Sequence, residues 1–205
     1  MKHECLLEDL FDKLVKQLSE ALPEFGKYLA IDSKAISSFA KRKNPRGQAD
    51  GRRDTDADYG CKTYRGQREG GTWWEKVVRW FGYKLHLIVD ATYELPVAYS
   101  VTKASQPDIN EAHALLERMK RRQPDLLETA ETLAGDKGYD DTKLIVKCWD
   151  EYKIKPVIDI RNCWKDGEET RVLTGKANVV YDYEGHVYWF LSGNRNTARD
   201  VGRRI

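Results

Sequence analysis

The chain has 205 residues, 40% of them hydrophobic and 33% charged, with a formal net charge of +2, which suits one sizeable domain with appendages. Its four cysteines are scattered and its four histidines complete no zinc spacing, so neither a disulfide framework nor a zinc site is expected. No apolar run approaches the roughly 20 residues that span a bilayer, and the polar start shows no signal peptide, so we expect a cytoplasmic protein without a membrane segment.

Residues 4–22 are predicted to form an amphipathic helix. Their apolar residues recur at helical spacing, and Pro23 and Gly26 end the pattern. The continuous apolar stripe indicates a helix that packs on the domain or on a partner subunit.

A short apolar run, Tyr28–Ile31, predicts a buried strand that ends at Asp32. Residues 41–72 then change character: they are basic, contain glycines and show no apolar periodicity, which predicts a long surface insertion. The aromatic and aliphatic residues from Trp73 to Phe81 are predicted to return the chain to the core. Stacking of their tryptophans on flipped bases is the alternative.

The next part of the chain predicts a hairpin and a helix. Apolar and polar residues alternate over 82–90, which is typical of a half-buried strand, and residues 96–102 form a second strand paired with it. Asp108 followed by Glu111 is a capping-box signature, and the helix that it starts ends before Pro124.

A second strand that ends at an aspartate follows, Leu133–Gly135 before Asp136. Asp140 or Asp141 caps a further helix, and residues 156–160 form another strand. Three consecutive strands followed by alternating helices and strands predict an α/β fold, a mixed sheet with flanking helices.

The last part, residues 161–205, has a different pattern. Residues 179–183 and 186–190 predict a β-hairpin around a Glu-Gly turn, and the polar residues beyond Leu191 show no periodicity, which predicts a frayed tail.

Asp32 and Asp136 share one sequence context, a carboxylate at the end of an apolar strand. If the two strands pair in parallel, both side chains emerge at the same sheet edge, where open sheets bind ligands. Two carboxylates there can hold Mg²⁺, which activates a water or hydroxyl and stabilises a leaving oxygen. The alternative for either aspartate alone is a turn former or helix cap.

Five motifs follow one another between residues 28 and 160: YLAIDSKAI, DADYGCKTY, GYKLHLIVDATYELPVAYSVTKAS, DINEAHALLERM and LAGDKGYDD. In this order they resemble the catalytic core of bacterial insertion-sequence DDE transposases, the group with a transposase DDE domain of the ribonuclease-H-like fold. The resemblance implies a mixed five-stranded sheet in which the first and fourth strands are adjacent. It also implies that Asp32 and Asp136 are the first two catalytic aspartates and ligands of Mg²⁺ or Mn²⁺, with two ions in the complete enzyme.

The expected domain organisation has three parts. Residues 1–26 form an N-terminal helix, and residues 27–160 form the ribonuclease-H-like DDE catalytic core, with 41–72 as its basic insertion loop. Residues 161–205 form a partial β-rich insertion subdomain with a hairpin and tail.

The third acid of the family, a glutamate, lies on a helix after the fifth strand in a Tyr-x-x-Arg-x-x-x-Glu type motif. No such motif precedes Ile205, and Glu168, Glu169 and Glu184 lie in loop or hairpin contexts. We therefore expect a truncated transposase that ends inside the insertion before the catalytic helix. This expectation leaves open whether the 205-residue chain is active alone.

Basic residues near the two aspartates and in the insertion are candidates for contacts to DNA phosphates, with a solvated surface as the alternative. Asp58 and Tyr139 lie in the matched motifs and are candidates for ordering the active site. Lys84 and His86 fit a solvated strand face equally well. The DNA-binding candidates are Lys34, Lys41, Arg42, Lys43, Arg46, Lys62 and Lys137.

The predicted function is DNA transposition by an insertion sequence. The chain would bind double-stranded DNA at transposon terminal repeats, hydrolyse a phosphodiester to free a 3′-hydroxyl and join it to target DNA. We expect a homodimer on DNA, in association with the bacterial nucleoid. The alternatives are a non-catalytic DNA-binding remnant, a stand-alone nuclease of the ribonuclease-H class, and a structural partner that dimerises through its N-terminal helix.

Overall fold

The computed structural model describes residues 4–40, 54–161, 163–176 and 178–189. The chain divides into two compact units, residues 1–157 and 158–205, and each is considered by itself. No helix in the described part of the chain is both long and apolar enough to cross a membrane.

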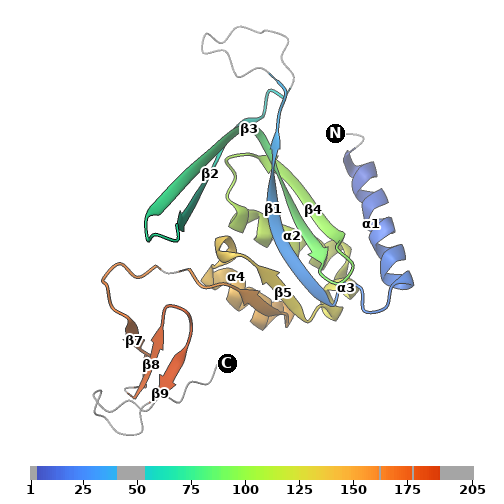
Figure 1. Cartoon of the computed structure of the whole chain (residues 1–205). Helices are drawn as coiled ribbons and strands as arrows, with labels where there is room; N and C mark the ends of the chain where they lie inside the picture. Colours follow the sequence, from blue (N-terminus) through green and yellow to red (C-terminus); the bar gives the residue numbers. More distant parts are fainter. Residues whose placement is uncertain (1–3, 41–53, 162, 177, 190–205) are drawn as a thin grey trace. The chain divides into compact units, whose positions relative to one another are not determined.

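A mixed, six-stranded sheet forms the centre of the first unit (Figure 1). Its strands follow the order β2-β3-β1-β5-β6, and β4 pairs with β3. β1 pairs antiparallel with β3 and parallel with β5. The strand bounds are β1 Tyr28–Ser37, β2 Asp58–Gln67, β3 Trp73–Asp90, β4 Leu95–Lys103, β5 Thr132–Gly135 and β6 Lys155–Ile158.

Five of these strands form the predicted sheet. β2 pairs only with the first half of β3, whereas the second half of β3 lies between β4 and β1. The central order is therefore β4-β3-β1-β5-β6, in which the first and fourth predicted strands, β1 and β5, are neighbours. This arrangement, with helices beside the sheet, confirms the predicted α/β class and is consistent with a ribonuclease-H-like fold.

The core lies where α2 covers the sheet. Four apolar residues on one side of this helix are buried, at the helical spacing that the sequence predicted, and strand residues such as Leu29 and Ile88 are buried as well. The helices are α1 Glu4–Ala21, α2 Asp108–Arg122, α3 Pro124–Thr129 and α4 Thr142–Val146, which continues as a π-helix to Tyr152.

The N-terminal helix α1 packs on the domain through one side only. Its Phe11 ring lies edge-on against Tyr99 of β4, with centroids 4.8 Å apart, and Val15 is fully buried. Asp9 accepts a hydrogen bond from Arg122 of α2 at 2.6 Å. Four leucines along the helix stay more than half exposed: Leu6, Leu7, Leu10 and Leu14.

Two boundary predictions need correction. β1 continues past Asp32 to Ser37, because β3 pairs with it along that whole stretch. The capping box at α2 is wrong: the Asp108 carboxylate accepts from Lys84, and Glu111 accepts from Ser100, so neither side chain caps the helix.

The prediction of an irregular insertion is wrong over its second half, where β2 pairs with β3 along its full length. Two glycines conceal this strand in the sequence, since glycine weakens strands and marks sites of close approach. The Trp80 ring lies over Gly60 and the Trp74 ring lies over Gly66. Each ring occupies the space that a side chain at the glycine would need. Residues 41–53 lie outside the described residues.

The prediction that residues 73–81 lie in the core is also wrong for the first residues of this segment. Trp73 is 73% exposed, and Trp74, Val77 and Val78 are exposed as well, because they lie on the hairpin that β3 forms with β2.

The second unit contains an antiparallel sheet of β7 (Thr170–Val172), β8 (Val179–Asp182) and β9 (Val187–Trp189), which includes the predicted hairpin. Asp182 accepts hydrogen bonds from the backbone and ring of His186 and from the Tyr188 hydroxyl. Burial alone would raise the Asp182 pKa, but these bonds outweigh it and lower that pKa to about 2. The predicted tail lies outside the described residues.

Candidate active site

The parallel pairing of β1 and β5 brings the two predicted catalytic aspartates together. The register pairs Leu29 with Leu133 and Ile31 with Gly135, so the next neighbouring positions are those of Asp32 and Asp136. Neighbouring strands lie about 4.8 Å apart, and equal steps along two paired strands place side chains on the same face. Both aspartates are exposed.

Local backbone contacts orient each carboxylate. Asp136 Oδ1 accepts a hydrogen bond from the Gly138 amide at 2.7 Å and thereby caps the 3-10 turn Lys137–Tyr139. A Cβ atom at Gly138 would lie 2.7 Å from that oxygen, so the turn favours glycine. Asp32 Oδ1 accepts from the Ser33 amide, also at 2.7 Å. Within the described residues the second oxygen of each carboxylate accepts no hydrogen bond, which leaves it available to a ligand.

Tyr139 is buried, with 2% of its surface exposed, and lies close enough to both carboxylates to feel their charge. Burial raises its pKa well above the ordinary value, and the negative charges of Asp108, Asp32 and Asp136 raise it further. The Ser33 side chain offsets a small part of this rise, but the Tyr139 hydroxyl has no partner of good hydrogen-bond geometry in the described structure. The hydroxyl therefore stays protonated among three carboxylates.

A polar cluster surrounds Asp108 at the start of α2. Lys84 donates to the Asp108 carboxylate at 2.9 Å and to the Gln106 carbonyl at 2.7 Å. The buried His86 places Nδ1 3.7 Å from Asp108 and Nε2 2.8 Å from the Thr102 hydroxyl. Burial lowers the His86 pKa, although the charge of Asp108 opposes that change. Asp108 is thus engaged by Lys84, unlike the two exposed aspartates.

Asp58 fixes the loop that leads into α2. Its carboxylate accepts hydrogen bonds from the Ser105 amide at 2.9 Å and from the Ser105 hydroxyl. Because Asp58 begins β2 and Ser105 lies just before α2, this contact holds the hairpin and the start of the helix together.

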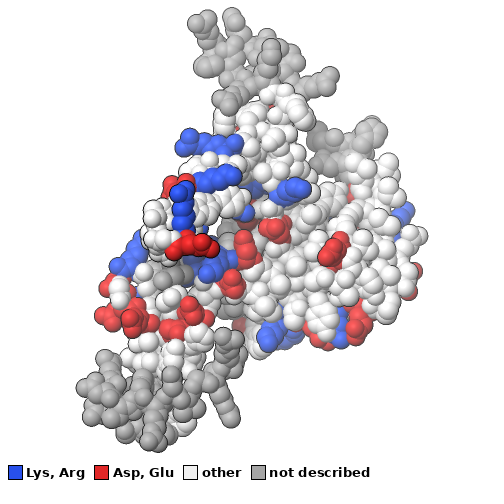
Figure 2. Space-filling view, in the orientation of Figure 1, with Lys and Arg blue, Asp and Glu red and all other residues white. Residues whose placement is uncertain are grey.

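The predicted DNA-binding residues fall in different places. Lys34 lies two residues beyond Asp32 and therefore on the same face of β1, whereas Lys62 lies on β2. Lys137 follows Asp136 directly and is exposed. In Figure 2, Lys and Arg side chains gather over the hairpin of β2 and β3. Lys41, Arg42, Lys43 and Arg46 lie outside the described residues.

The donor set fits a hard divalent cation in part. Carboxylate oxygens are ligands that Mg²⁺ and Mn²⁺ prefer, and two carboxylates directly follow the last residue pair of β1 and β5. Across the described ranges, however, no three His, Cys, Asp or Glu side chains form a group that could hold a metal. A third protein ligand was not predicted from the sequence either.

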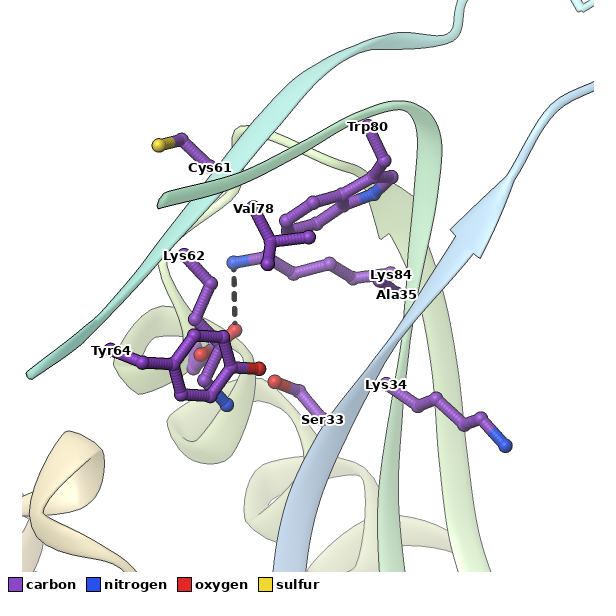
Figure 3. A pocket seen from close by; sticks show the side chains of 10 residues that line it. Ser33, Lys34, Ala35, Cys61, Lys62, Tyr64, Val78, Trp80 and Lys84 are labelled. Atoms are coloured by element: carbon purple, nitrogen blue, oxygen red, sulfur yellow. Dashed lines mark hydrogen bonds and ion pairs between the residues drawn. The ribbon is translucent and has the colours of Figure 1, made fainter. Parts of the chain in front are cut away.

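A cavity of about 270 Å³ lies beside this site and was not predicted (Figure 3). Ser33, Lys62, Tyr64, Trp80, Lys84 and Asp108 are among the residues that line it. The signal available in the sequence was alternation within β2, which places Gly60, Lys62 and Tyr64 on one face.

One comparison with known proteins gives a match. A family model described as "Transposase DDE domain" matches residues 25–199, which include both strands that carry the paired aspartates. No curated protein and no solved structure matches the chain. Because the match spans most of the sequence, the chain belongs to the family of transposase DDE domain proteins.

Proposed function

We propose that Asp32 and Asp136 are the metal ligands of an insertion-sequence transposase, which hydrolyses a phosphodiester at the transposon end and transfers the freed strand to target DNA. The observation that supports this proposal is the register of β1 and β5, whose last pair, Ile31 and Gly135, directly precedes the two aspartates. Their exposed carboxylates suit Mg²⁺ or Mn²⁺, two of which the complete enzyme would hold.

When bound, such a cation polarises a phosphoryl oxygen and lowers the pKa of a water or hydroxyl nucleophile. The chain's own residues orient the ligands and the DNA. Backbone amides hold one oxygen of each carboxylate, and the buried, protonated Tyr139 near them adds no further negative charge. Lys34, on the face of Asp32, and Lys137, next to Asp136, are in positions to contact DNA phosphates.

A nicking assay tests the catalytic assignment. The full chain should nick a supercoiled plasmid in the presence of Mn²⁺, and Asp32→Asn or Asp136→Asn should each lower the rate about a hundredfold or more. Asparagine keeps an oxygen for the local backbone amide but loses the charge. Asp125→Asn, an exposed change in α3, serves as the control. Unchanged nicking by both aspartate variants would refute the assignment.

A second candidate function is a DNA-binding remnant without catalysis. It is favoured by the lack of a third metal-ligating side chain among the described residues. A chain of this kind would bind duplex DNA with steep salt dependence, yet Mn²⁺ would produce no nicks. A ribonuclease-H-class nuclease would instead cut without joining strands, which a strand-transfer assay with a pre-cut end would reveal.

We also propose that the chain forms a homodimer on DNA. The exposed leucines of α1 supply an apolar stripe for such a contact. Sedimentation of the DNA complex tests it: Leu7→Lys and Leu10→Lys together should leave one copy per DNA, whereas an unchanged mass would contradict a dimer through α1.

A further inference from the structure

Two buried polar atoms near the active site lack a hydrogen-bond partner within the described part of the chain. They are Nδ1 of His86 and the hydroxyl oxygen of Tyr139. Both side chains are almost fully buried, with 1% and 2% of their surface exposed. A buried polar atom without a partner is costly, and native proteins rarely leave one. Each atom therefore needs a partner among its neighbours.

His86 and Tyr139 reach the same region from two different elements. His86 of β3 pairs in register with Ser33 of β1, so both side chains lie on the sheet face opposite to that of Asp32. The Tyr139 ring lies over Gly135, where a Cβ atom would be 3.3 Å from it, and its hydroxyl comes close to the Ser33 side chain. The two unpartnered atoms thus lie on one face of the sheet.

The carboxylate of Asp108, at the start of α2, lies beside both atoms. Its Oδ1 is 3.7 Å from Nδ1 of His86. Among the nearby carboxylates, Asp108 raises the Tyr139 pKa most, which indicates that the hydroxyl points toward it. Lys84 makes the one hydrogen bond that this carboxylate accepts from the described residues (Figure 3), whereas a carboxylate can accept about four. Asp108 therefore has room for both missing donors.

The second ring nitrogen of His86 is compatible with this assignment. Nε2 lies 2.8 Å from the Thr102 hydroxyl, which can donate to it. Burial lowers the His86 pKa and so favours the neutral ring, which carries one proton. With Nε2 as the acceptor, that proton lies on Nδ1 and points to the carboxylate.

Tyr139 connects Asp108 to the turn that carries Asp136. It ends the 3-10 turn that Asp136 caps, and its amide donates to the Asp136 carbonyl at 3.0 Å. The amide of Gly138, in the same turn, holds the Asp136 carboxylate at 2.7 Å. A displacement of Tyr139 would therefore displace this carboxylate as well.

We propose that Asp108 is a positioning residue for the metal site: its carboxylate accepts hydrogen bonds from His86 Nδ1 and from the Tyr139 hydroxyl, and through Tyr139 it holds the turn that orients Asp136. A shift of about 0.5 Å brings His86 within hydrogen-bond distance. The inference rests on the proposed function for the role of Asp136 as a metal ligand.

NMR of the full chain without metal tests the hydrogen bonds. At neutral pH the imidazole nitrogen signals of His86 should show the proton on Nδ1. The Gly138 amide should exchange slowly with solvent in the wild type and at least about tenfold faster in Asp108→Asn, because the turn is then held less firmly. A His86 proton on Nε2, or unchanged exchange at Gly138, would overturn the inference.

Mn²⁺ binding to the full chain tests the positioning role against a matched contact on the same helix. Glu117 also accepts hydrogen bonds from a tyrosine, Tyr152 at 3.0 Å, and from a lysine, Lys147. It lies nine residues (117 minus 108), or about 13 Å, further along α2 than Asp108.

Asp108→Asn and Tyr139→Phe should each lower the Mn²⁺ affinity about tenfold, as groups that orient metal ligands do. Tyr139→Phe keeps the buried ring, so it tests the same contact even if Asp108→Asn does not fold. Glu117→Gln and Tyr152→Phe should lower stability but leave the Mn²⁺ affinity unchanged. Wild-type Mn²⁺ affinity in Tyr139→Phe, or an equal loss in Tyr152→Phe, would overturn the inference.

The inference and the proposed function can fail separately. If Asp32→Asn and Asp136→Asn weaken Mn²⁺ binding but Tyr139→Phe does not, the positioning role alone is wrong. If neither aspartate variant changes Mn²⁺ binding, the proposed metal site is wrong, and the NMR result without metal still decides whether Asp108 holds the turn.

Discussion

The buried carboxylate of Asp90 joins two loops at the base of the sheet. It is fully buried and accepts hydrogen bonds from the amides of Gly26 at 2.7 Å, Thr92 at 2.9 Å and Tyr93 at 2.7 Å. Gly26 lies just before β1, so Asp90 positions the strand that carries Asp32.

Asp90→Ala should therefore destabilise the chain strongly. Hydrogen bonds to a charged group contribute about 1.5–3 kcal/mol each, and buried amides left without a partner add a cost, so we expect a loss of about 3 kcal/mol or more. Urea unfolding followed by tryptophan fluorescence measures it, with Asp150→Ala, an exposed change, as the control. A loss below about 1 kcal/mol would show that water replaces the carboxylate.

His86 should make stability depend on pH. Its pKa in the folded chain is lowered from 6.5, mainly by burial, so the unfolded chain takes up a proton first as the pH falls. Stability is then lost below about pH 6.5, by at most about 1.4 kcal/mol per pH unit, down to the lower native pKa. Thermal unfolding at pH 7.5 and 5.5 tests this.

The fall in stability between pH 7.5 and pH 5.5 should be smaller in His86→Gln. It should persist in His113→Gln, which removes a part-exposed imidazole. If His86→Gln shows the full wild-type fall, another group is responsible for it.

At the level of single residues, the sequence pointed to Asp32 and Asp136 as candidates but gave no indication of the cavity. Asp32 and Asp136 could be singled out because each follows a short apolar run, a local pattern. Tyr64 and Trp80 meet Ser33 only through the pairing of three strands and the position of α2. These residues are far apart in the sequence, so their common position around one cavity cannot be predicted from residue types alone.

The hairpin of β2 and β3 depends on two glycines that accept tryptophan rings. A Cβ atom at Gly60 would lie 2.3 Å from the Trp80 ring, so Gly60→Ala must displace the ring and break its hydrogen bond to the Tyr83 carbonyl. We expect a loss of about 1–3 kcal/mol, typical of overpacking. Gly70→Ala is the matched control, because a Cβ atom there meets nothing within 4 Å.

Chemical denaturation measures the difference in stability between the two glycine variants. The indole NMR signal of Trp80 reports displacement of the Trp80 ring. Equal stability of both variants, with an unmoved Trp80 signal, would contradict this packing of the hairpin.

Helices and strands with clear periodicity were predicted near their observed bounds, including α1, β4, α2 and the hairpin of the second unit. β2 was missed because its glycines and charges mask the alternation until the partner strand is known. The capping prediction at α2 failed for a related reason: Asp108 has a long-range partner, Lys84, that no local motif reveals.

On the scale of the whole molecule, the order of strands connects the sequence to the proposed chemistry. Parallel pairing of β1 with β5 joins residues 104 positions apart (136 minus 32), and the resemblance to DDE transposases implied that these two strands are neighbours. The family match over residues 25–199 agrees with that architecture. Among the described residues, no group of three His, Cys, Asp or Glu side chains supplies the third metal ligand expected of the family.

Binding of Mn²⁺ to the full chain, followed by electron paramagnetic resonance without DNA, tests the central claim most directly. The wild-type chain should remove free Mn²⁺ from solution, Asp32→Asn and Asp136→Asn should each lower the affinity at least about tenfold, and Asp125→Asn should match the wild type. If both aspartate variants bind Mn²⁺ as the wild type does, the paired carboxylates are not the metal site and the proposed chemistry fails.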